Sequence, residues 1–386
     1  MTDAREKLVY LVATEESGDR LGSALMRTLR EKLGGNVRFA GVGGRTMAAE
    51  GLTTLFPIEE LSIIGLAAVV KSLPLILRRL RETADAAVAA RPDVVVLIDS
   101  PDFNLRLAKR IRARSKDLPV VAYVSPSVWA WRSGRAKAMR GSVDHVMALL
   151  PFEPEVHRRL GGPPCSYVGH PLIERLDVLR PNAEEAQRRN AQPPVLLALP
   201  GSRRSEIFHH MKIFGETLGQ LRAGGAEFEL VVPIMPHVEA AVLEAVKDWP
   251  VKPRVVIGEA EKTAAFRSAR AALAKSGTVT LELAIAGVPM VAAYKAGAVE
   301  AWIITKIIRT STVILANLVV GDNVVPEFIQ NDCTAEKLAP ALRDILLDTP
   351  RRQRQVDAFA RLDTIMSTGG RTPSECAADM VLAAMR

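Results

Sequence analysis

Cysteine, aromatic residues and long apolar runs are all scarce in this sequence. The 386 residues include 3 cysteines, Cys165, Cys333 and Cys376, which lie far apart and form no CxxC pair. This spacing excludes a disulfide-built scaffold and is typical of a protein in a reducing compartment. Phe, Trp and Tyr make up only 5% of the chain, and it carries neither an RNA-binding signature nor a zinc-ligand spacing. Nucleic acid is therefore not an expected partner.

A membrane-spanning helix and a signal peptide are not expected either. The longest apolar tract, residues 61–77, contains Lys71 and Pro74 and is short for crossing a bilayer. The N-terminal MTDAREK leads directly into a strand-like run, without the apolar region of a signal peptide. These features predict a cytoplasmic protein.

Positive charge is in excess. Lys and Arg number 51 against 43 Asp and Glu, which gives a net charge of +8. Such a balance suits phosphorylated substrates or an anionic membrane surface. Residues 61–80 are largely apolar, and Arg78, Arg79 and the following Arg81 lie at their polar end, which favours an exposed rim held against anionic lipid. The alternative is an ordinary core helix broken by Pro74. The sequence leaves the oligomeric state open, a homodimer included.

Strand-like and helix-like patterns alternate along most of the chain. Uninterrupted Val, Leu and Ile runs predict strands covered on both faces, as in a parallel sheet. We expect strands at 8–13, 38–42, 93–98, 120–124, 145–149, 166–168, 195–199, 229–233, 254–257, 271–274 and 290–294. We expect helices at 20–32, 75–90, 105–114, 205–222, 238–247 and 280–286. The predicted fold class is α/β, with two doubly wound Rossmann-like domains facing a cleft and a helical C-terminal segment.

The strand series restarts after a proline-rich segment, residues 171–194. We therefore expect an N-terminal, acceptor-side domain over 1–171 and a nucleotide-sugar domain over 172–348. The helices of 349–386 follow, for which packing back on the first domain is one arrangement.

Two motifs in the second half each resemble a strand, a tight polar turn and a helix. They are LPGSRRSEI at 199–207 and AKSGTVTLELAIAGVPMV at 274–291. Helix N-termini at the carboxyl ends of parallel strands favour a diphosphate. The candidate donor-binding residues are Gly201, Ser202, Arg203, Ser276, Gly277, Thr278 and Glu282. Arg203 provides a forked donor for phosphate, and Glu282 can accept two ribose hydroxyls. The pattern predicts a nucleotide-sugar site.

Three polar loops in the first half also follow predicted strands. They span 14–19 (TEESGD), 98–104 (IDSPDFN) and 123–132 (YVSPSVWAWR). The candidate residues on them are Ser17, Gly18, Asp19, Asp99, Asp102, Ser125, Ser127 and Trp129. Structural interpretations stay open: residues 17–19 or either aspartate can cap a helix, and the tryptophan can simply pack.

The ordered set of motifs resembles one family. SGDxxG, IDxPDFN, YVSPSVWAWR, LLPFE, VGHPL, LPGSR and SGTxxLE, from about residue 8 to 334, are similar to those of lipid-A-disaccharide synthase. The resemblance implies an inverting GT-B glycosyltransferase of bacterial lipid A assembly, peripheral to the inner membrane. Its donor would be UDP-2,3-diacylglucosamine and its acceptor 2,3-diacylglucosamine 1-phosphate. The products would be the β-1,6-linked disaccharide phosphate and UDP.

The resemblance and the strand-end position together make Asp99 the expected catalytic base, with Asp102 as second candidate and loop organiser. By resemblance only, Asn317 lies near the donor. GT-B enzymes generally need no metal, the chain has no DxD motif, and its 6 histidines lack ligand spacing, so we expect no catalytic metal and no cofactor. The alternatives are another GT-B enzyme that uses UDP-N-acetylglucosamine (a glycosyltransferase or a 2-epimerase) and a non-catalytic protein that binds nucleotide sugar or lipid.

Overall fold

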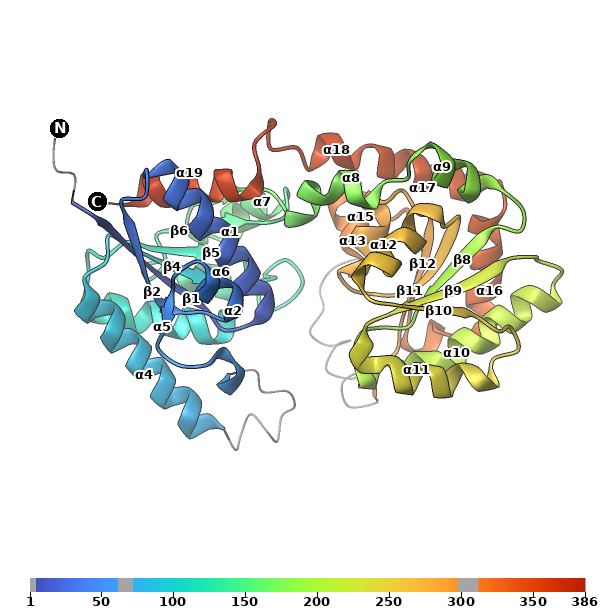
Figure 1. The fold of residues 1–386 in the computed structure, drawn as a ribbon, viewed down its shortest axis with the longest axis horizontal. Helices are drawn as coiled ribbons and strands as arrows, with labels where there is room; N and C mark the ends of the chain where they lie inside the picture. Colours follow the sequence, from blue (N-terminus) through green and yellow to red (C-terminus); the bar gives the residue numbers. More distant parts are fainter. Residues whose placement is uncertain (1–4, 62–71, 298–311, 386) are drawn as a thin grey trace. The chain divides into compact units, whose positions relative to one another are not determined.

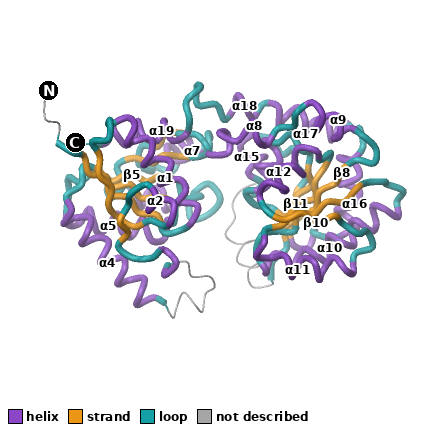
Figure 2. Tube along the Cα trace, viewed as in Figure 1, coloured by secondary structure: helices purple, strands orange, loops and turns teal. Residues whose placement is uncertain are grey.

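The computed structural model describes residues 5–61, 72–297 and 312–385 (Figure 1). The chain divides into two compact units. The first comprises Met1–Pro171 and Thr368–Arg386, and the second comprises Leu172–Ser367. In each unit the strands lie inside and the helices cover them, as Figure 2 shows by colour.

The first unit is built on a parallel sheet of order β3-β2-β1-β4-β5-β6-β7. Its strands are β1 (Lys7–Ala13), β2 (Val37–Val42), β3 (Thr53–Thr54), β4 (Val94–Ile98), β5 (Val120–Tyr123), β6 (His145–Ala148) and β7 (Cys165–Tyr167). Its helices are α1 (Glu16–Lys32), α2 (Arg45–Ala49), α4 (Leu73–Ala90), α5 (Pro101–Arg114), α6 (Gly134–Met139), α7 (Glu153–Arg159) and α19 (Pro373–Ala384). One apolar core includes side chains of α1 and α19, and another includes side chains of α4 and α5, so the sheet is buried on both faces.

The second unit repeats this plan with the parallel order β10-β9-β8-β11-β12-β13. Its strands are β8 (Val195–Leu199), β9 (Glu229–Ile234), β10 (Arg254–Ile257), β11 (Ala271–Lys275), β12 (Met290–Tyr294) and β13 (Glu327–Ile329). Its helices are α8 (Leu176–Leu179), α9 (Ala183–Asn190), α10 (Arg204–Ala223), α11 (Glu239–Ala245), α12 (Glu259–Ser268), α13 (Val279–Ile285), α15 (Leu315–Val320), α16 (Ala335–Leu346), α17 (Pro350–Ala360) and α18 (Leu362–Ile365).

The predicted fold class is confirmed, since both units are doubly wound parallel sheets. Two short strands, β3 and β13, were not predicted from the sequence. They contain two and three residues, which is too few to show a recognisable pattern. Two helices begin four residues earlier than predicted. Helix α1 starts at Glu16 instead of residue 20, and α5 starts at Pro101, a residue suited to the first helical turn, instead of residue 105.

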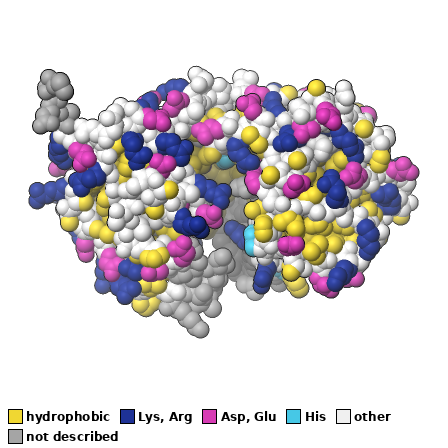
Figure 3. Space-filling model, in the orientation of Figure 1, with side chains coloured by type: hydrophobic (Ala, Val, Ile, Leu, Met, Phe, Trp, Pro, Cys, Tyr) yellow, Lys and Arg dark blue, Asp and Glu magenta, His cyan; other side chains and the backbone are white. Residues whose placement is uncertain are grey.

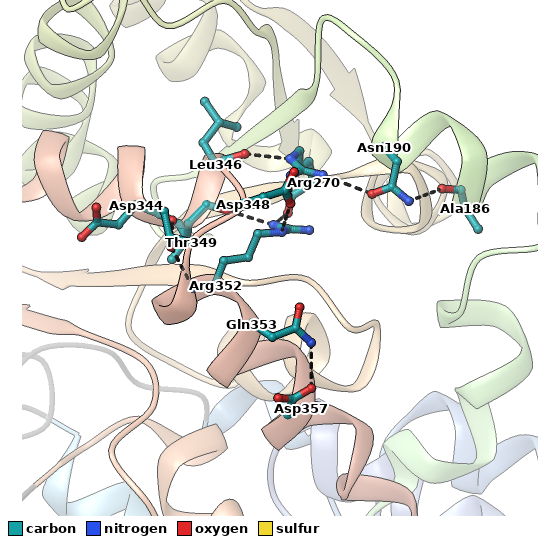
Figure 4. A network of polar contacts seen from close by, with 11 residues as sticks. Ala186, Asn190, Arg270, Asp344, Leu346, Asp348, Thr349, Arg352, Gln353 and Asp357 are labelled. Carbon is teal, nitrogen blue, oxygen red and sulfur yellow. Dashed lines mark hydrogen bonds and ion pairs between the residues drawn. The ribbon is translucent and has the colours of Figure 1, made fainter.

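The C-terminal helices divide differently from the expected boundary at residue 348. Helix α16 lies before that boundary and belongs to the second unit as expected, but α17 and α18 also belong to the second unit, and of the helices after residue 348 only α19 belongs to the first. The reason is a network of buried polar contacts (Figure 4). Arg352 donates to the backbone oxygens of Arg270 and Ile345 at 2.7 and 2.8 Å, and Arg270 Nε donates to the Leu346 oxygen at 2.7 Å. Burial lowers the pKa of Arg352 to about 10. These bonds fix α17 against α16 and against Arg270, the residue that precedes β11.

The structure describes only part of the apolar segment 61–81 with its basic end. Residues 62–71, including Ile64 and Val69, lie outside the described residues. Within α4, Arg79 forms ion pairs with Glu60 and Glu82, each at 2.7 Å, and therefore contributes less free positive charge than expected. Over the described ranges, no helix is both long enough and apolar enough to span a membrane.

Candidate active site

A pocket of about 460 Å³ lies at the carboxyl ends of β8, β9 and β11 in the second unit. Six of the predicted donor residues line it: Gly201, Ser202, Arg203, Gly277, Thr278 and Glu282. The structure also adds side chains that the sequence did not indicate. They are Glu206, Met235, Lys262 and Lys275. The lining therefore combines three cations with two carboxylates, as expected for a site that binds phosphate and hydroxyl groups.

The first loop is shaped by one glycine and one glutamate. Gly201 has a φ of 129°, and a Cβ on it would lie 2.5 Å from the Glu206 Cβ, so a larger residue does not fit. The Glu206 carboxylate accepts hydrogen bonds from the Ser202 and Arg203 amides at 2.9 and 3.2 Å. The same carboxylate accepts one from Lys275 Nζ at 2.9 Å. These three donors form an anion-binding site, which the Glu206 carboxylate itself occupies in this structure.

Glu206 is thus the main donor-site residue that the sequence analysis missed. Burial acts to raise its pKa, but Lys275 and the two loop amides outweigh burial and hold the pKa below its ordinary value. A partial signal was present in the sequence, because Glu206 stands three residues after the N-cap Arg203 and accepts from its backbone amide, as the glutamate of a capping box does, although arginine cannot supply the other half of that motif. The contact with Lys275 had no such signal, since the two residues lie 69 positions apart.

Glu282 lies on the first turn of α13 and faces a lysine from another helix. Lys262 Nζ on α12 is 2.7 Å from Glu282 and 3.1 Å from Glu259. Both side chains of the Lys262–Glu282 pair are largely buried, at 16% and 14% exposure. The lysine therefore orients the carboxylate that was predicted to hold the ribose.

Two predicted donor residues are structural. Ser276 is 7% exposed, and its amide donates to the Ala293 oxygen at 2.8 Å, which extends the pairing of β11 with β12. Asn317 is 2% exposed, and its amide group bonds the backbone N–H and C=O of Val325 at 2.9 and 3.0 Å. Neither residue is among the described residues that line the pocket. The Asn317 side chain fixes the turn after α15, and its position near the donor, expected by resemblance only, stays a prediction.

Asp99, the expected base, follows the last residue of β4. It has a φ of 55° and the next residue, Ser100, a φ of 42°, so two non-glycine residues adopt the left-handed conformation in succession. Such strained backbone is concentrated at functional sites. Asn104 stabilises the turn by donating to the Asp99 and Ile98 oxygens at 2.8 and 3.1 Å. Ser17 Oγ donates to the Asp99 carboxylate at 3.3 Å, which brings two predicted site residues together.

Gly18 allows close packing of α1 on the sheet, and Asp19 forms hydrogen bonds with the start of α2. A Cβ on Gly18 would lie 3.3 Å from the Ala13 Cβ, so glycine lets α1 approach the sheet closely. Asp19 is 2% exposed and its carboxylate accepts from the amides of Gly44, Thr46 and Met47 at 2.7 to 3.1 Å. It therefore caps α2 from a distant part of the chain, a role that the interpretation of residues 17–19 as the cap of their own helix did not include.

Asp102 acts as a loop organiser and not as a helix cap. Its carboxylate pairs with Arg132 at 3.3 Å and also with Arg135, and no cap hydrogen bond is formed. These ion pairs connect the start of α5 to Arg132 in the loop that follows β5 and to Arg135 in α6.

The loop after β5 rests on a buried polar cluster formed by Ser125, Trp129, Glu153 and His157. Ser125 Oγ lies 2.9 Å from His157 Nε2, and Trp129 Nε1 donates to Glu153 at 3.3 Å. Glu153 Oε2 also accepts from the Leu150 amide at 3.0 Å. Ser125 and Trp129 are thus fixed by His157 and Glu153, whereas Ser127 between them is exposed.

Burial dominates the electrostatics of this cluster. It raises the pKa of Glu153 from 4.5 to about 7, although hydrogen bonds from Leu150 and Trp129 act in the opposite direction. Burial also lowers the pKa of His157. Val124, directly before the loop, has a φ of 83°, an outlier for a β-branched residue. The loop conformation is therefore imposed by its surroundings. Across the part of the chain that the structure covers, no group of three or more His, Cys, Asp or Glu is placed to hold a metal ion.

Comparisons with known proteins agree on one family. A family model for lipid-A-disaccharide synthetase matches residues 9–381. The lipid-A-disaccharide synthase of Bradyrhizobium diazoefficiens is 67% identical over 381 residues, which cover 99% of this chain and 97% of the relative.

Solved structures resemble the fold. The UDP-GlcNAc 2-epimerase from Neisseria meningitidis bound to UDP-GlcNAc has a TM-score of 0.59 at 12% identity, covering 97% of this chain and 99% of that chain. MurG of Acinetobacter baumannii has a TM-score of 0.58 at 13% identity, with the same coverage of 97% and 99%. At such identities the likeness shows the fold alone.

Proposed function

This chain belongs to the lipid-A-disaccharide synthase family, and on that premise we propose that it joins UDP-2,3-diacylglucosamine to 2,3-diacylglucosamine 1-phosphate. The products are the β-1,6-linked disaccharide phosphate and UDP. The single observation that carries the proposal, beside the family match, is the pocket of the second unit, with cations, loop amides and a ribose-ready carboxylate at strand ends.

In this proposal the pocket binds the UDP part of the donor. The Arg203 side chain is 74% exposed and lies 3.7 Å from Glu206, so its guanidinium can turn towards a phosphate. Lys262 and Lys275 add positive charge where the leaving diphosphate gains negative charge. Glu282 accepts hydrogen bonds from the ribose hydroxyls, with its orientation fixed by Lys262.

Asp99 of the first unit is the proposed base. The acceptor's 6-hydroxyl oxygen attacks the anomeric carbon of the donor, and the bond from that carbon to the β-phosphate oxygen breaks. Inversion follows because attack and departure take place on opposite faces of the ring. The hydroxyl proton passes to the Asp99 carboxylate, which Ser17 orients through its 3.3 Å hydrogen bond. The proposal requires Asp99 to meet the donor held by the second unit.

The decisive experiment is product analysis with defined substrates. Incubation with both acylated monosaccharides should release UDP and give one disaccharide phosphate by mass spectrometry. Either substrate alone should give neither product, which separates transfer from epimerisation and from simple binding. Equal turnover of unacylated substrates would contradict the proposed specificity, and no UDP release with the complete pair would contradict the function.

We also propose that the protein acts at the cytoplasmic surface of the inner membrane, where substrates with acyl chains reside. The net charge of +8 supports attraction to anionic lipid. Vesicle co-sedimentation that weakens as salt rises is the expected result, and binding that does not respond to salt would contradict this electrostatic account.

A further inference from the structure

A second, larger hollow lies on the second unit between α10 and α11. Its volume is about 950 Å³, about twice that of the donor pocket. Ile207, Phe208 and Met211 of α10 form one wall, and Ala240 and Ala241 of α11 form the other. Figure 3 shows hydrophobic side chains gathered on the visible face of the second unit, in the area of these helices. We call this hollow the α10–α11 groove.

The groove is rigid at its base. Trp249 is 4% exposed, and its Nε1 donates to the Met211 oxygen at 2.9 Å. Gly215 lies against the same indole, where a Cβ would approach the ring to 2.5 Å. The groove is therefore preformed, and an occupant does not need to open it.

One large apolar side chain in the groove is almost entirely in water. Phe208 is 82% exposed, the highest value among the exposed large hydrophobic residues of the described chain. An apolar surface that remains exposed in a preformed hollow marks a binding site for an apolar ligand.

The groove adjoins the donor pocket through shared backbone. The N-cap residue of helix α10, Arg203, and Glu206 in its first turn line the pocket, and two residues later Phe208 lines the groove. On the other side, the loop after β9 contributes Met235 to the pocket and His237 to the groove. His237 Nε2 donates to the Ser202 oxygen at 2.6 Å, so one hydrogen bond connects a groove residue to a pocket residue.

The charges around the groove do not favour an anionic partner. The charged lining residues are two cations, Arg204 and Lys212, and two anions, Glu216 and Asp248. These charges cancel, so nothing attracts an anionic headgroup or an acidic peptide more than a neutral chain. An uncharged aliphatic chain matches both the apolar walls and the balanced rim.

We propose that the α10–α11 groove binds an acyl chain of the nucleotide-sugar donor. The inference rests on the proposed function, since it assumes a donor with acyl chains whose UDP part occupies the neighbouring pocket. In the complex the chain covers Phe208 and Ile207 and lies against the Trp249 base. The groove then supplies affinity that grows with chain length, because each buried methylene adds to binding.

Cross-linking gives the direct test. A donor with a diazirine at the end of one acyl chain is bound to the full-length protein, irradiated and digested. Labelled peptides should come from residues 204–216 and 239–250. Labels confined to other parts of the chain would overturn the inference.

Substitutions give the second test. Ala241→Trp fills the groove and Phe208→Ser removes its exposed aromatic wall, whereas Leu243→Ser is the matched control on α11, 42% exposed and outside the groove lining. For long-chain donors, Ala241→Trp should raise KM by about tenfold, the equivalent of roughly two lost methylenes. For UDP alone, calorimetric affinity should stay unchanged. Leu243→Ser should behave like the wild type in both assays.

The outcomes separate the two proposals. If UDP binds and the disaccharide forms, but KM depends on chain length equally in wild type and Ala241→Trp, the groove inference alone fails. If no UDP is released from any donor, the proposed function fails first. A changed sedimentation mass in Ala241→Trp would instead show that a second copy of the chain covers the groove, which would also overturn the inference.

Discussion

Glu153 gives the sharpest prediction, because its environment couples the proton to the stability of the first unit. The carboxyl is buried under the loop that carries Ser125 and Trp129, and burial raises its pKa from 4.5 to about 7. Between these two pH values the folded state holds a proton that the unfolded state has lost. The contribution of Glu153 to the free energy of unfolding should therefore fall as pH rises through this interval and level off above about pH 7, whereas the lowered pKa of His157 acts in the opposite direction, so the prediction concerns the difference between wild type and Glu153→Gln.

The size of the effect follows from the two pKa values. A rise from 4.5 to about 7 corresponds to about 3 kcal/mol at full ionisation. Glu153→Gln cannot ionise, so this pH-dependent loss should be absent in the variant. Any constant cost of the amide does not matter, because the prediction concerns only the change with pH.

The assay is urea unfolding at about pH 5 and about pH 8, read by hydrogen exchange in peptides from residues 120–159. These peptides report the first unit without interference from the second. Glu155→Gln is the matched control on α7, because Glu155 is exposed and paired with Arg158, which holds its pKa below the ordinary value. An equal change in the stability of wild type and Glu153→Gln between these two pH values would refute the reasoning. So would a Glu155→Gln variant that behaves like Glu153→Gln.

Further predictions concern the proposed site and the membrane. Asp99→Asn should keep the fold, since asparagine tolerates the left-handed φ of 55°, and should lower turnover at least about a hundredfold; near-normal turnover would place the base elsewhere. Arg203→Ala should lower kcat/KM by about ten- to hundredfold and Arg203→Lys should restore only part of it, because a point charge cannot replace the fork; full activity of the lysine variant would mean that charge alone matters. Replacing Ile64 and Val69 with Ser should weaken binding to anionic vesicles and leave UDP affinity intact, whereas an unfolded first unit would show that these residues belong to the core.

Local pattern was enough to predict most of the fold. Continuous apolar runs such as residues 195–199 and 290–294 predicted strands that the structure reproduces with the same bounds. Because ligand loops follow the carboxyl ends of parallel strands, the same pattern also located Gly201, Arg203 and Glu282, which line one pocket. These features depend on short stretches of chain, where periodicity and turn chemistry act directly.

Only the tertiary structure decided which polar side chains are available to a ligand. Asp19 and Asn317 look like site residues in the sequence, yet Asp19 accepts from backbone amides 25 to 28 residues along the chain, and Asn317 bonds the backbone of Val325 across a turn. Glu206 looks like a helix cap, yet it also holds Lys275 in the donor pocket. A side chain's partner is set by packing between segments that are distant in the chain. Periodicity indicates which face of an element is buried, but it does not indicate which polar group on a neighbouring segment will be its hydrogen-bond partner.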